Sequence, residues 1–89
     1  MKYAITLENL GTVNKNRVNI GNLSLWFSYE TIVAFDHPLT SFICSENVWS
    51  KTTGKLLNEI CPNKKERMEH DRFVLRLNDL MTQLHLVTE

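Results

Sequence analysis

The sequence predicts an α+β fold in which a small antiparallel β-meander of four or five strands, about residues 2–45, is covered by two helices. The first is a short helix, about residues 52–61, and the second a C-terminal amphipathic helix, about residues 70–86. Apolar residues alternate with a period of two before residue 50 and recur every three or four residues after it. With 89 residues, 43% hydrophobic and 22% charged, we expect residues 1–89 to form a single domain around one core.

The strand predictions rest on alternation and on the turn-forming residues between the runs. Lys2–Leu7 is the first candidate, and alternation resumes at Arg17–Ile20 after a segment rich in Gly and Asn. The clearest run is Leu23–Tyr29, whose odd-numbered residues form an apolar face and whose even-numbered residues form the other face. Ile32–Phe35 continues this strand or pairs with it. The proline at position 38 ends the strand, because proline cannot extend a central strand. Ser41–Cys44 is the last candidate.

The first helix is predicted from a change of period after residue 50. Leu56, Leu57 and Ile60 share one face of a helix of two or three turns, and Ser50, Thr52 or Thr53 is available as its N-cap. The sequence Pro62-Asn63 ends it, because proline cannot continue the helix. The charged run that follows is expected to be a solvated connector.

The C-terminal helix has the most regular pattern in the chain. Its apolar residues, spaced four, three, four and three apart, are Phe73, Leu77, Leu80, Leu84 and Val87. This spacing places them in a stripe along one side, so we expect the helix to pack on the sheet. We expect aspartate at Leu77 to prevent folding, because it would bury an unpaired charge.

Two leucines lie on the opposite face of this helix. Leu75 and Leu86 are three turns apart among polar neighbours. Single exposed leucines are ordinary, but two on one outward face predict a surface for a partner or for self-association as a homodimer.

Two motifs carry a resemblance to a known family. Phe27–Phe35 reads F-S-Y-E-T-I-V-A-F, and Ser45–Lys55 reads S-E-N-V-W-S-K-T-T-G-K. Over about residues 18–80 the chain resembles small domain-of-unknown-function proteins of phages, plasmids and microbial genomes, with F-S-Y-x-T-x-V-A-F followed by E-N-x-W-S-x-T-T-G-K-H-L-N. Leu56 stands where that pattern has His. The resemblance implies a mobile-element accessory protein and no particular reaction.

The net charge of zero excludes a strongly cationic nucleic-acid binder as the default, but the charges are not evenly spread. Five basic and two acidic residues between positions 51 and 67 sum to +3, and the rest of the chain sums to −3. The basic residues are Lys51, Lys55, Lys64, Lys65 and Arg67. This is a modest basic patch on a helix and its connector, and a solvated connector is the favoured explanation.

The start of the first helix is the candidate contact site. Hydroxyls, lysines and an aromatic residue gather there, where free N–H groups favour an anion. The predicted contact residues are Trp49, Ser50, Lys51, Thr52, Thr53 and Lys55, with Lys64, Lys65 and Arg67 from the connector. The alternative interpretation is a capped helix start with Trp49 filling the gap between helix and sheet. A nucleotide-binding P-loop is excluded, because its first glycine and its Ser or Thr after the lysine are absent.

The titratable residues form no catalytic motif. His70 and Asp71 are adjacent on a helix and point in different directions, and Cys44 in an apolar strand is expected to be an inert core thiol. A metal site of Cys44, Cys61 and His37 matches no known ligand spacing. We therefore expect no catalytic residue, no metal and no cofactor.

These observations predict a small non-enzymatic accessory protein of phage or mobile-element type that acts by binding a protein. An anti-defence or host-takeover inhibitor is the sharpest form of this prediction. The alternative is a nucleic-acid or nucleotide-phosphate binding module using Ser50–Lys55 and Lys64–Arg67. No export signal or apolar span is visible, so the expected location is the cytoplasm, that of the host if a phage encodes the protein.

Overall fold

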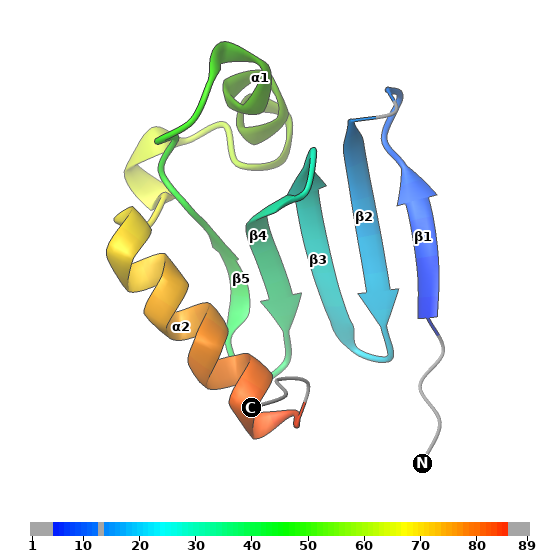
Figure 1. Cartoon of the computed structure of the whole chain (residues 1–89). Coiled ribbons are helices and arrows are strands. Elements are labelled where there is room, and N and C mark those ends of the chain that lie inside the picture. The colour runs from blue at the N-terminus through cyan, green and yellow to red at the C-terminus, as the bar shows by residue number, and fades with distance from the viewer. Residues whose placement is uncertain (1–4, 13, 86–89) are drawn as a thin grey trace.

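The computed structural model of the chain describes residues 5–12 and 14–85. Its five strands are β1 (Ile5–Asn9), β2 (Lys15–Ile20), β3 (Leu23–Ser28), β4 (Thr31–His37) and β5 (Ser41–Cys44). Each strand pairs antiparallel with the next, so the sheet is a meander in the order β1-β2-β3-β4-β5 (Figure 1). The predicted α+β class and the five-strand meander are confirmed.

The β2–β3 hairpin follows from its sequence. Ile20 pairs with Leu23 across the two-residue turn Gly21-Asn22, and Gly21 has a φ of 57°. Glycine adopts this left-handed conformation without a steric penalty, and such two-residue turns match the twist of the adjoining strands. Gly21-Asn22 is therefore the turn that the sequence predicts.

The β3–β4 hairpin departs from the simple alternation in the sequence. β3 ends at Ser28, and Tyr29 lies in the turn with a φ of 57° and not on the strand face with Leu23 and Leu25. Trp26 pairs with Ala34 but Phe27 pairs with Ile32, so Val33 is an extra residue in β4. This β-bulge shifts the alternation of β4 by one residue.

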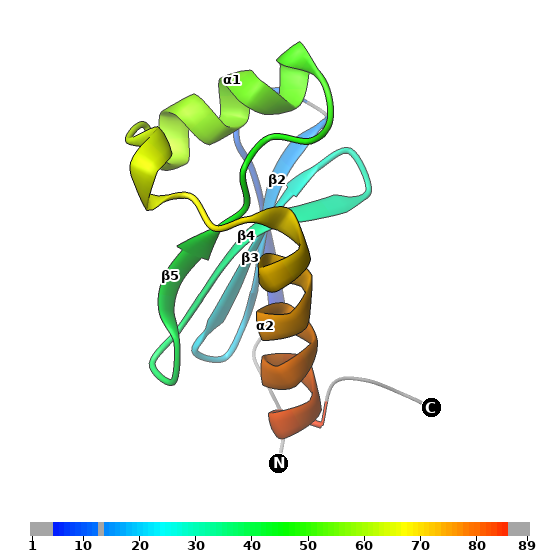
Figure 2. The ribbon, with the colours of Figure 1, turned by 90° about the vertical axis from the view of Figure 1, so that its left-hand side faces the viewer.

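The two predicted helices are confirmed as α1 (Lys51–Ile60) and α2 (His70–Gln83), with a short 3-10 turn, η1 (Lys64–Glu66), between them. Figure 2 shows α1 crossing the end of the sheet while α2 runs along it. Glu69, the N-cap of α2, makes no side-chain cap, and the Glu46 carboxylate accepts from the His70 N–H instead at 3.3 Å. Leu86 and Val87 lie outside the described residues.

Each helix covers one face of the sheet near β4. The α2 face is defined by five buried residues, namely Leu23, Leu25, Phe35, Phe73 and Leu80. The opposite face packs on α1 through a second buried cluster, which we call the α1 core and which consists of Val33, Ala34, Cys44, Leu56, Leu57 and Cys61. In the predicted stripe of α2, Phe73 and Leu80 are fully buried, whereas Leu77 and Leu84 are only partly buried. The largest effects of substitution are therefore expected at Phe73 and Leu80.

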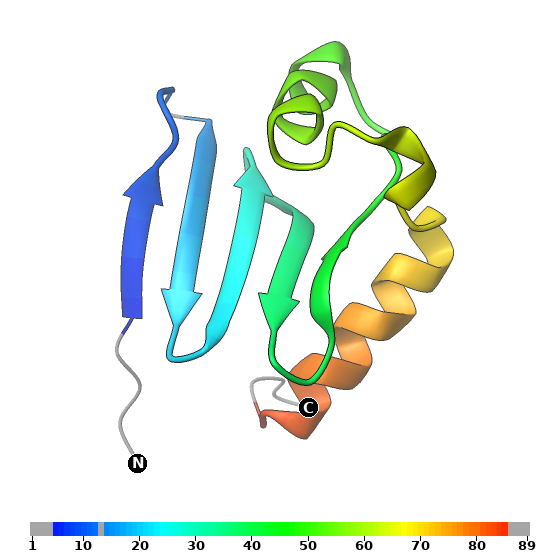
Figure 3. The same ribbon diagram turned by 180° about the vertical axis from the view of Figure 1, so that it is seen from behind.

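The two edges of the sheet differ. Along β5, Met68 donates its N–H to the Cys44 oxygen at 2.8 Å, and α2 runs beside this edge (Figure 3). At the other edge, β1 is exposed along its whole length, with Ile5 68% and Leu7 69% exposed. No helix among the described residues is long and apolar enough to cross a membrane.

Candidate functional site

The predicted contact residues at the start of α1 are largely engaged within the protein. The Ser50 hydroxyl accepts from the Thr53 N–H at 3.4 Å and so caps the helix. Thr53 itself is buried, and its hydroxyl is 2.8 Å from that of Ser28. The prediction that Thr53 contacts a partner is therefore wrong, because its side chain joins α1 to β3. Thr52 is exposed.

The loop before α1 explains the glycine in this motif. The Asn47 side chain donates to the Ser50 carbonyl at 3.0 Å and accepts from the Trp49 N–H at 3.0 Å. A Cβ at Gly54 would lie 2.9 Å from the Asn47 amide nitrogen, closer than Cβ atoms are found. Gly54 therefore gives Asn47 the room to hold this loop against the helix.

Trp49 connects the two helices. It is partly buried against the α1 core, and its ring meets that of His70 at 5.1 Å in an edge-on arrangement. The predicted alternative, in which Trp49 fills a gap inside the fold, describes this placement.

The basic residues do not converge on one point. Lys51 and Lys55 are exposed on α1, while Lys64 and Lys65 are exposed on η1 beyond its other end. A helix of this length spans about 15 Å. Arg67 is committed elsewhere, because its guanidinium donates to the Cys61 carbonyl and to the Asn58 side chain, both at 3.0 Å. The exposed lysines therefore lie in two pairs on separate elements, α1 and η1.

A Ser–His pair is present that the sequence pattern does not reveal, since its members are 25 residues apart. The Ser45 hydroxyl lies 3.0 Å from His70 Nδ1 and donates its proton to the Glu46 carbonyl at 2.8 Å. The direction of the bond between Ser45 and His70 follows the tautomer of the imidazole ring. Ser45 is also fully buried. The pair fastens α2 to the loop after β5.

The two cysteines are free and buried in the α1 core. Burial raises the pKa of the Cys44 thiol to about 12, and the neighbouring Cys61 thiol contributes to the rise. A thiol protonated at neutral pH is a poor nucleophile and metal ligand. Among the described residues, no group of three or more His, Cys, Asp and Glu side chains gathers in a way that suits a metal ion.

Toward β1, the sheet presents apolar residues that are exposed or only partly buried. Register places Leu7 beside Val18, and Val18 beside Leu25, on the face that packs on α2. A hollow of about 330 Å³ lies here, lined by Leu7, Asn16, Val18, Phe27, Tyr29 and Glu30. We call Ile5, Leu7, Val18, Phe27 and Tyr29 the open sheet surface.

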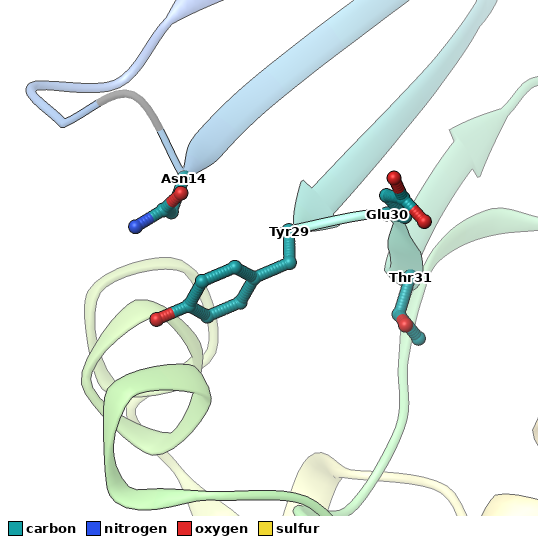
Figure 4. Close-up of a pocket in the computed structure, with 4 residues that line it drawn as sticks. All are labelled: Asn14, Tyr29, Glu30 and Thr31. Atoms are coloured by element: carbon teal, nitrogen blue, oxygen red, sulfur yellow. The ribbon is translucent and has the colours of Figure 1, made fainter.

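Tyr29 stands at the rim of this surface and borders a second hollow of about 580 Å³, lined by Asn14, Tyr29, Glu30 and Thr31. Figure 4 shows its ring projecting toward Asn14 and away from Thr31. Tyr29 is 53% exposed, and its backbone has a φ of 57°, a conformation that bulky residues rarely adopt. Strained residues cluster at functional sites, so Tyr29 is a candidate that alternation alone assigned to the buried face.

The opposite face of the sheet is more polar. Arg17 pairs with Glu8 and lies over the Trp26 ring at 5.7 Å, and Trp26 meets Phe42 edge-on at 5.3 Å. These contacts link side chains of β1, β2, β3 and β5 to one another. Phe42 is 38% exposed, less than Ile5 and Leu7 on the open sheet surface.

The predicted outward face of α2 is exposed where it is described. Leu75 is 64% exposed, beside Val74 at 38%. Leu86 lies outside the described residues, so the second half of that predicted interface has no structural counterpart.

One family model matches the chain. It is that of DUF8033, a family of unknown function, and the match extends over residues 2–74. No curated protein and no solved structure matches the chain significantly.

Proposed function

Because the chain belongs to the DUF8033 family, whose function is unknown, we propose its function from its surface: it binds another protein through the open sheet surface and catalyses no reaction. The observation that carries this proposal is the 68% and 69% exposure of Ile5 and Leu7 next to an apolar hollow. Contiguous exposed apolar residues mark protein contact sites in soluble domains. Tyrosine, as at position 29, is enriched among the residues that dominate binding energy.

The charges around this surface favour a protein over a nucleic acid. Glu30 is the charged residue that lines the hollow, and a carboxylate repels phosphate. The exposed lysines are divided between the first half of α1 and η1, and Arg67 is held by Cys61 and Asn58. Affinity capture with and without nuclease therefore has to distinguish a protein partner from a nucleic-acid or nucleotide-phosphate partner.

In its sharper form, the proposal is that this is a phage or mobile-element accessory protein that inhibits a host system, such as a defence system, in the host cytoplasm. The resemblance of Phe27–Phe35 and Ser45–Lys55 to proteins of such elements supports this setting. The first motif contributes Phe27 and Tyr29 to the open sheet surface. The second holds the α1 loop, through Asn47 and Gly54.

Tyr29→Gly is expected to separate binding from stability. Glycine removes a left-handed strain of about 1–2 kcal/mol and loses about 0.5–1 kcal/mol to its own backbone entropy. The free energy of unfolding should therefore rise by about 0.5–1 kcal/mol, measured by urea unfolding. Loss of a contact of about 1.4 kcal/mol should weaken partner binding about tenfold. A variant that is less stable and binds normally would contradict the role of Tyr29.

The partner is best sought by affinity capture from a bacterial lysate, with and without nuclease. The wild type should retain a protein that nuclease does not remove and that Val18→Lys/Tyr29→Gly loses. A matched control, Lys51→Glu/Lys55→Glu, should retain it. Material that disappears with nuclease, with the control variant or steeply with salt would favour nucleic acid and overturn the proposal.

A further inference from the structure

The outer edge of β1 has the geometry to pair with another strand. Leu10 donates its N–H to the Lys15 carbonyl at 2.8 Å, which makes residues 10 and 15 a hydrogen-bonded pair. In an antiparallel ladder such pairs alternate, so Thr6 and Glu8 direct their backbone groups to β2. The N–H and C=O groups of Ile5, Leu7 and Asn9 therefore point outward.

β1 has little protection at this edge. Natural sheets block an edge with charged side chains, proline, a bulge or a covering segment. Ile5–Asn9 contains no proline or bulge, its one charged side chain, Glu8, pairs with Arg17 of β2, and no described residue pairs with its outer side. β5 differs at its C-terminal end, where Met68 forms backbone hydrogen bonds with Cys44 and Glu46.

We propose that β1 pairs antiparallel with β1 of a second copy, about a two-fold axis at Leu7, to form a continuous ten-stranded sheet. Leu7 then faces Leu7 of the partner subunit, and Ile5 faces Asn9 of the partner subunit. Each of these pairs exchanges the outward hydrogen bonds, and both leucines lose exposed apolar area.

The charges select this register. Thr6 faces Glu8 of the partner subunit, and its hydroxyl, which accepts from Asn19 at 3.1 Å, retains a proton to donate to that carboxylate. An axis at Glu8 would oppose two glutamates, which is destabilising.

A two-fold axis perpendicular to the sheet keeps the two open sheet surfaces on the same side. They would meet at the axis, with one copy of α2 flanking each outer end. The association uses the backbone edge of β1 and needs no partner other than a second copy, but Leu7 belongs both to this contact and to the open sheet surface.

The test is the mass of the protein by light scattering over a micromolar to millimolar concentration series. The wild type should reach twice the mass of the chain, and Leu7→Lys should remain at the mass of one chain. The matched control Leu75→Lys, at a leucine of similar exposure, should behave as the wild type. A monomeric wild type, or a dimer that Leu75→Lys abolishes and Leu7→Lys does not, would overturn the proposal.

A second variant makes the test independent of how Leu7→Lys folds. Directly opposed residues of a hydrogen-bonded pair have Cα atoms about 5.5 Å apart, within the range of a disulfide. Leu7→Cys should therefore cross-link to its own copy under oxidation by diamide, while Leu75→Cys should not. Equal cross-linking of the two variants would contradict an axis at Leu7.

Discussion

Phe73→Ala is expected to lower the free energy of unfolding by about 3–5 kcal/mol, most of the stability of a domain this small. Phe73 is 1% exposed and its ring lies 5.4 Å from that of Phe35, so truncation leaves a cavity between α2 and the sheet. Urea unfolding followed by circular dichroism gives the value. The protein should be partly unfolded without denaturant.

Two controls make this result specific to the packing of α2. Leu75→Ala, on the outward face of the same helix, should change the free energy by less than about 0.5 kcal/mol. Leu77→Ala should fall between the two, because Leu77 is only partly buried. Equal losses at Phe73 and Leu75 would contradict the packing described here.

The Cys44 thiol should make the protein less stable in alkali. Its pKa is 9.0 ordinarily and about 12 in the folded protein, where burial is the main cause. Above pH 9.0 the unfolded chain releases this proton while the folded protein retains it. The free energy of unfolding should thus fall by up to about 1.4 kcal/mol per pH unit until pH about 12.

The control is Cys44→Ala, in which the other titrating groups remain. Urea unfolding of both proteins under reducing conditions should give parallel pH profiles below pH 9.0 and a steeper decline for the wild type above it. Identical slopes would mean that Cys44 ionises as freely in the folded protein as in the unfolded chain.

Apolar periodicity predicts the two helices correctly, because each helix buries the apolar residues that repeat at helical spacing. α2 was predicted from its stripe because Phe73 and Leu80 repeat at helical spacing and are both buried in the α2 face. α1 was predicted from Leu56 and Leu57 for the same reason. The Gly21-Asn22 turn was predicted because glycine marks a positive φ.

Alternation was a poor guide where backbone irregularities occur. The β-bulge at Val33 adds a residue to β4, and Tyr29 adopts a φ of 57° in a turn without glycine. Neither residue type signals such geometry, since β-branched and bulky residues favour extended backbone. The alternating pattern therefore predicts that Tyr29 belongs to the strand, whereas it lies in the turn at the rim of the open sheet surface.

The candidate site was predicted from local composition, and pairings between distant residues changed it. Thr53 looked available at the helix start, but Ser28, 25 residues earlier, occupies its hydroxyl. The sequence predicts Arg67 as a contact residue, but its guanidinium donates a hydrogen bond to the carbonyl of Cys61, the C-cap residue of α1. The open sheet surface was not predicted, because exposure of Leu7 depends on which strands the helices leave uncovered.

Amide hydrogen exchange of the protein alone and with its captured partner tests the central claim most directly. Binding through the open sheet surface predicts added protection at β1, at Val18 and from Phe27 to Thr31. The first half of α1 and η1 should exchange as in the free protein. Protection confined to residues 51–67, around the exposed lysines, would contradict the claim.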